Sequence, residues 1–223
     1  MRRRLTGVLL SVFLVLSAGF ACGQEQNLLP KYGSEPKSDA LKAADAVFIA
    51  EMDKEYRGDR VKASADIATR GWQYVSQGDF DGAMRRFNQA WLLDAKNGTA
   101  LWGMAAVETS AGNFDESLKL FVEAEKYVGD NLNFSVDFAK ALGVAGATLK
   151  DDSLLKMAYN RFQVNYKKAP ENTNNLQNWA ITLFGVGKYS DAWAKVKLAE
   201  VTPDKGQLDP QFIAALQAKM PRP

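Results

Sequence analysis

Few side chains in this sequence have the type and spacing that catalysis requires. The chain contains no histidine, which excludes histidine general bases and histidine metal ligands. Two carboxylate pairs, Asp115-Glu116 and Asp151-Asp152, stand where helices are predicted to start. Negative charge at a helix start interacts favourably with the helix dipole, so we interpret both pairs as helix-start residues. We therefore predict no catalytic residue, no metal site and no cofactor, and expect that the protein is not an enzyme.

The one cysteine, Cys22, directly follows an apolar run and points to export rather than to thiol catalysis. Residues 1–21 start with three arginines and continue as an apolar stretch that ends in small residues, which is typical of a cleaved signal peptide. The alternative is a permanent membrane helix, but the run is short for the ~20 apolar residues that span a bilayer. A cysteine in this position resembles the lipid-attachment site of bacterial lipoproteins. Ordinary cleavage near Ala21, which would leave a soluble protein, is the other possibility.

These features predict an exported protein. The lipoprotein resemblance implies an outer membrane lipoprotein facing the periplasm, because Gly23 replaces the aspartate often found in lipoproteins retained at the inner membrane. A soluble periplasmic protein is the alternative. Residues 22–37 contain two prolines and two glycines, and we predict a lipid-anchor cysteine followed by a flexible linker. Without residues 1–21 the chain has 25 basic and 26 acidic residues, so it lacks the basic character of nucleic-acid binders.

The remaining sequence contains a repeat with a period of 34 residues. Identical residues recur at this spacing at Ser76/Ser110, Gly78/Gly112, Phe80/Phe114, Asp81/Asp115, Phe87/Phe121 and Ala90/Ala124. Each copy has two segments with apolar residues three and four positions apart, separated by a break at Gly78 or Gly112. The repeat therefore predicts pairs of antiparallel helices. Small residues should lie at each crossing, and Phe87 and Phe121 should fill the wedge before the next pair.

This pattern resembles the tetratricopeptide repeat, whose units combine a small residue and an aromatic in the first helix with A-x3-F-x2-A in the second. The first unit matches at Gly71, Tyr74, Ala83, Phe87 and Ala90, and three later units match in part. The resemblance implies an all-α, right-handed α-solenoid of helix pairs, with units at about 64–97, 98–131, 139–172 and 173–206. We place the helical domain at 38–219: Ser38 starts a leading helix that covers the first pair, and 208–219 form a C-terminal cap.

The same resemblance implies that partners contact the outward face of the first helices. The matching positions are Ala68, Trp72, Thr99, Trp102, Ala106, Lys140, Asn174, Gln177 and Ile181. Trp72 and Trp102 have the type of side chain that anchors an extended peptide. The alternative is that both tryptophans pack against neighbouring helices.

Two functions fit this sequence. The leading hypothesis is a non-enzymatic scaffold or adaptor in the bacterial envelope that binds a protein or peptide partner on the concave face of the solenoid. The alternative is a periplasmic glycan- or peptidoglycan-associated protein, in which the same tryptophans would stack on sugars.

Overall fold

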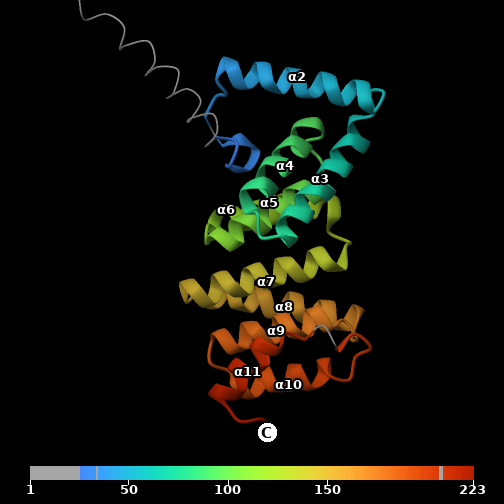
Figure 1. The fold of residues 1–223 in the computed structure, drawn as a ribbon. Helices are drawn as coiled ribbons and strands as arrows, with labels where there is room; N and C mark the ends of the chain where they lie inside the picture. Colours follow the sequence, from blue (N-terminus) through green and yellow to red (C-terminus); the bar gives the residue numbers. More distant parts are fainter. Residues whose placement is uncertain (1–25, 34, 206–207) are drawn as a thin grey trace, which may run out of the picture. The chain divides into compact units, whose positions relative to one another are not determined.

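The computed structural model describes residues 26–33, 35–205 and 208–223, so the predicted signal peptide and Cys22 lie outside the described residues. Within these ranges every regular element is a helix (Figure 1). The elements are η1 (Pro30–Tyr32), α2 (Asp39–Glu55), α3 (Arg60–Ser76), α4 (Phe80–Leu93), α5 (Gly98–Ala111), α6 (Phe114–Val128), α7 (Leu132–Leu149), α8 (Asp152–Lys168), α9 (Thr173–Gly185), α10 (Tyr189–Ala199) and α11 (Pro210–Lys219). The chain forms two compact units, which divide after Gly103, within α5.

The boundaries of several helices depend on local capping chemistry. The side chains of Ser38, Asn97 and Asn172 each accept a hydrogen bond from the backbone N–H three residues further on. Gly78 and Gly112 occupy the same position in two repeats, and both have a positive φ, 75° and 82°. That backbone conformation favours glycine, so each residue ends one helix and allows the turn to the next.

In the first unit, the ring of Phe87 lies between glycines of two other helices. Phe87 is fully buried. A Cβ atom at Gly71 of α3 would lie 2.4 Å from its ring, and one at Gly103 of α5 would lie 2.1 Å from it. Both approaches are closer than any side chain permits, so glycine is required at each position. The predicted role of Phe87 as the wedge between successive helix pairs is confirmed.

The segment of residues 26–33, here called the N-terminal strap, packs against the first unit. The prediction of a flexible linker over 22–37 does not describe this part. The Nδ2 atom of buried Asn88 in α4 donates to the backbone carbonyls of Asn27 and Leu29, both at 2.9 Å. Tyr32 is only 4% exposed, and the ammonium of Lys37 lies 3.1 Å from its ring centroid. The composition of the segment suggested a linker, but its order depends on hydrogen bonds from a residue about sixty positions away.

Helix α2 forms as predicted but does not cover the first helix pair. None of its residues is buried, and Val47 is 60% exposed. A salt bridge of 2.7 Å between Asp53 and Arg60 links its end to the start of α3. The apolar residues at helical spacing correctly indicated a helix, but that spacing says nothing about which surface the helix meets.

The second unit repeats the helix-pair packing. Ser117 of α6 donates 2.9 Å to the carbonyl of Ala105, which confirms the small residues predicted at this crossing. Phe121 is buried and stacks on Phe138 of α7, with ring centroids 4.9 Å apart and planes at 8°. A Cβ atom at Gly143 would lie 2.4 Å from Thr182 Oγ1, so α7 and α9 pack closely. The expected all-α class of packed helix pairs is confirmed.

Helix α11 closes the end of the second unit. Phe212 and Leu216 are buried in one core with Leu183, Trp193 and other side chains of α9 and α10. The indole N–H of Trp193 also donates 3.0 Å to the carbonyl of Met220. The C-terminal segment therefore forms the cap that its apolar spacing predicts.

Candidate functional site

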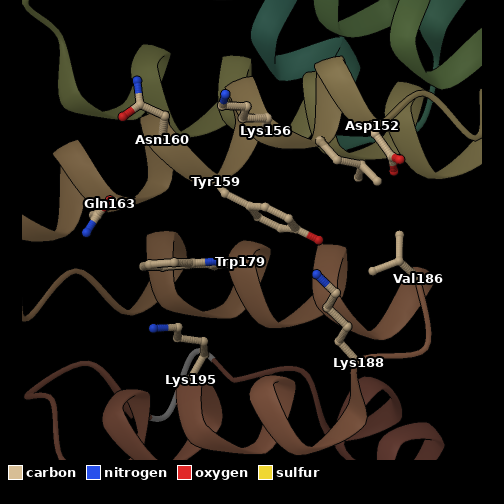
Figure 2. A pocket seen from close by; sticks show the side chains of 10 residues that line it. Asp152, Lys156, Tyr159, Asn160, Gln163, Trp179, Val186, Lys188 and Lys195 are labelled. Atoms are coloured by element: carbon tan, nitrogen blue, oxygen red, sulfur yellow. The ribbon is translucent and has the colours of Figure 1, made fainter.

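A cleft of about 880 Å³ opens in the second unit. Helix α8 contributes Asp152, Lys156 and Tyr159, and α9 contributes Trp179 (Figure 2). Lys188 directly precedes α10, and Lys195 lies within it. We call this feature the lysine–aromatic cleft. Its volume lies within the range of ~300–1,000 Å³ that is common for ligand pockets, so it is large enough for a short segment of a partner.

Neighbouring rings and ammonium groups fix the aromatic side chains of the cleft. Phe162 of α8 is fully buried and stacks on Trp179, with centroids 6.0 Å apart and planes at 11°. The Nζ atom of Lys195 lies 3.7 Å from the Trp179 ring centroid, and that of Lys188 lies 5.4 Å from the Tyr159 centroid. Two cations are thus held at the wall of the cleft by the faces of aromatic rings.

The electrostatics of the cleft follow from partial burial. Burial lowers the pKa of Lys195, although the nearby carboxylate of Asp191 acts in the opposite direction. Burial raises the pKa of Tyr159, and Asp191 and Asp152 add to this effect. The Tyr159 hydroxyl is buried and has no hydrogen-bond partner within the described chain. The cleft therefore has a partly desolvated cation and a buried hydroxyl without a hydrogen-bond partner among the described residues.

The structure brings two of the predicted partner-binding residues together in the first unit. The rings of Trp72 and Trp102 meet edge to face, with centroids 4.7 Å apart and planes at 60°. Trp72 also contacts Phe87 at 5.6 Å, and its buried indole nitrogen has no hydrogen-bond partner among the described residues. Both tryptophans are half-buried. They form one aromatic cluster that packs against Phe87.

The other predicted positions differ in their surroundings. Ala68 is fully buried and so cannot contact a partner. Thr99 and Ala106 are partly exposed, and Lys140 is exposed. In α9, Gln177 accepts a hydrogen bond of 2.6 Å from the backbone N–H of Asp209, and Ile181 packs against the core that α11 closes. Asn174 accepts from Asn178 Nδ2 at 2.8 Å. These three residues of α9 thus have contacts within the second unit.

The sequence analysis missed the lysine–aromatic cleft because it considered only one face of α9. Trp179 follows Gln177 by two positions, which places it roughly 200° around the helix from the predicted face. One signal was present: Lys195 lies in α10 seven residues after Lys188, the residue that precedes this helix, a spacing close to two helical turns. The contribution of Tyr159 from α8 depends on tertiary packing and has no local signal.

Two further properties limit what the described residues can do. No group of three or more cysteine or acidic side chains in residues 26–33, 35–205 and 208–223 is arranged to hold a metal ion. Over the same residues, no helix combines the length and the apolar character needed to cross a membrane.

Comparison with known proteins agrees with this architecture. Residues 74–142 match a family model of the tetratricopeptide repeat. The chain is also similar in structure to a thermophilic tetratricopeptide repeat protein of Thermus thermophilus, with a TM-score of 0.61 and 17% sequence identity. That similarity covers 71% of this chain and 84% of the other. No curated protein matches the chain in sequence. The fold class is therefore that of tetratricopeptide repeat proteins.

Proposed function

We propose that this chain is a non-enzymatic scaffold that binds a protein partner in the bacterial envelope. The observation that carries the proposal is the lysine–aromatic cleft, an open surface formed by residues of α8, α9 and α10 and the turn before α10. Repeats of the tetratricopeptide type typically offer such surfaces for binding. The signal-like segment of residues 1–21 and the position of Cys22 support export and lipid attachment.

The contact surface proposed here differs from the one that the family resemblance implies. Gln177 has a hydrogen bond with the start of the C-terminal cap, and Ile181 packs against the core of α9, α10 and α11. Trp179, Lys188 and Lys195 border the open cleft instead. In the first unit, the half-buried pair Trp72 and Trp102 remains a second candidate surface for the partner.

A glycan-binding function has weaker support. Sugars bind to aromatic residues through an open ring face, but Phe162 and the ammonium of Lys195 already lie against the ring of Trp179. Trp72 likewise has aromatic neighbours in Phe87 and Trp102. We therefore favour a protein partner.

Site-specific photo-crosslinking in cells tests the proposal. A photoreactive amino acid replaces Gln163, an exposed residue that lines the cleft, in the full-length chain. The matched control carries the same group at Gln217, an exposed residue of α11 outside the cleft. We expect one identified envelope protein to be crosslinked from Gln163 and not from Gln217. Equal crosslinking from both positions, or none from Gln163, would contradict the assignment.

A further inference from the structure

The lysine–aromatic cleft has an excess of positive charge. Three lysines border it, Lys156, Lys188 and Lys195, and Asp152 is the one acidic residue among its lining side chains. Within the part of the chain that the structure describes, none of these three ammonium groups forms a salt bridge. Lysines on protein surfaces are commonly solvated, but two of these three are held against aromatic rings at the wall of the cleft.

The position of Lys195 makes an anionic ligand favourable. Its side chain is only partly exposed, and the ring of Trp179 compensates an ammonium charge less completely than a carboxylate does. The lowered pKa of Lys195 reflects the same loss of hydration. A ligand carboxylate beside this group would supply the missing compensation. Figure 2 shows the Tyr159 hydroxyl directed towards Lys188, on the far side of Trp179 from Lys195.

The geometry favours a peptide over the other common anions. Single-stranded nucleic acid is bound by stacking bases on open aromatic faces, whereas the ring of Trp179 is occupied by Phe162 and Lys195. Nucleic-acid sites also require a continuous basic surface, and here Asp152 and Asp191 lie among the lysines. Separate lysines beside aromatic rings instead match a peptide in which acidic and apolar side chains alternate.

We propose that the lysine–aromatic cleft binds an acidic, extended peptide segment of the partner protein. Lys188 and Lys195 contact the carboxylates of this peptide. The rings of Tyr159 and Trp179 contact its apolar side chains. This inference rests on the proposed scaffold function and specifies the chemistry of its partner. It also assigns partner binding to a surface of α8, α9 and α10 rather than to Asn174, Gln177 and Ile181.

Fluorescence anisotropy with the full chain tests the inference. The probe is a fluorescein-labelled peptide of alternating glutamate and leucine, and its control is the peptide with glutamine in place of glutamate. A labelled oligo-dT strand provides the nucleic-acid arm. We expect the glutamate peptide to bind at low salt concentration, and its affinity to fall as added salt screens the charges. The glutamine peptide should bind at least about tenfold more weakly.

The protein variants locate the binding surface. The double variant K188Q/K195Q should weaken binding of the glutamate peptide by about tenfold or more, because two charge-assisted contacts are lost. The matched control K197Q/K219Q removes the same charge from exposed positions of α10 and α11 and should leave binding unchanged. Circular dichroism on both variants verifies that they fold.

Three results would overturn the inference: equal binding of the two peptides, tighter binding of oligo-dT, or equal loss in both double variants. If the double variant fails to fold, the comparison of the two peptides on the wild-type chain still shows whether the cleft prefers an acidic peptide. If crosslinking from Gln163 identifies a partner but the glutamate peptide does not bind, the acidic specificity is wrong and the scaffold function stands. If neither is observed, both proposals fail.

Discussion

At the scale of single residues, the fully buried ring of Phe87 determines how closely three helices of the first unit approach. We predict that Gly103→Ala destabilises the protein by ~1–3 kcal/mol, because the new methyl group would overlap the ring and the core has no space for it. The matched control is Gly185→Ala, whose added methyl would meet only Ala147 at 3.6 Å. Urea denaturation measures the free energy of unfolding of both variants. A cost below ~0.5 kcal/mol for Gly103→Ala would show that the ring moves freely.

Glu108 provides a pH-dependent prediction at the same scale. This carboxyl is 6% exposed, and burial raises its pKa above the ordinary glutamate value; its hydrogen bond with Asn113 opposes the shift, and Glu116 adds to it. A raised folded-state pKa means that the folded protein binds the proton more tightly than the unfolded chain. The contribution of Glu108 to stability is therefore most favourable below its unfolded pKa and is lost as pH rises through the folded pKa.

We therefore expect Glu108→Gln to be more stable than the wild type at neutral pH, because the amide oxygen keeps the bond from Asn113 without a buried charge. The advantage should shrink as pH falls towards the ordinary glutamate pKa. Denaturation midpoints of both proteins across that pH range provide the measurement. A constant difference at every pH would mean that Glu108 does not titrate in this environment.

At the scale of elements, the two terminal helices contribute differently to stability. Phe212→Ala in α11 should cost ~3–5 kcal/mol because Phe212 lies in the core of the second unit. Val47→Ala in α2 should change the free energy of unfolding by less than ~1 kcal/mol, since Val47 is 60% exposed. Thermal melts of the two variants test this contrast. A large effect at Val47 would indicate that α2 is covered in solution by another chain.

The side chain of Asn88 makes two hydrogen bonds to the N-terminal strap, which allows this element to be tested. Asn88→Asp replaces the amide donor with an acceptor that faces the carbonyls of Asn27 and Leu29. We expect the loss of both hydrogen bonds and a cost of ~1–3 kcal/mol or local release of the strap. Hydrogen exchange should then accelerate across residues 26–33 while α8 to α10 remain unchanged. Unaltered exchange in the strap would show that its packing does not depend on Asn88.

At the scale of the whole molecule, the strap changes the expected reach from the membrane. If all of the predicted linker up to residue 37 were extended, it would span ~50 Å. Because the strap packs against the first unit, only residues 23–25 separate it from Cys22, a distance of ~10 Å at most. If Cys22 is lipidated, the first unit therefore lies close to the membrane surface.

Membrane attachment itself is predicted to depend on Cys22. Cys22→Ser should move the full-length protein from the membrane fraction to the soluble periplasmic fraction, because a lipid-attachment site needs the thiol. Fractionation and immunoblotting of both forms provide the measurement, and a radiolabelled fatty acid reports lipidation directly. A wild-type protein that is already soluble after export would favour ordinary signal cleavage.

Local patterns in the sequence determined the helices of this protein. The 34-residue repeat, the glycines with positive φ and the capping side chains of Ser38, Asn97 and Asn172 act within a few residues, so they identify each helix and its ends. The repeat also placed Phe87 and Phe121 correctly in the core, because residues at the same position of a repeat have equivalent neighbours.

Only the tertiary structure decided which surfaces are open and which are covered. Gln177 bonds to the start of the C-terminal cap, Asn88 bonds to the strap, and Tyr159, Trp179 and Lys195 meet at one cleft. Each of these facts joins residues that are 16 to 61 positions apart, or different faces of one helix. Such contacts depend on how helices pack, and the periodicity of one helix carries no information about its neighbours.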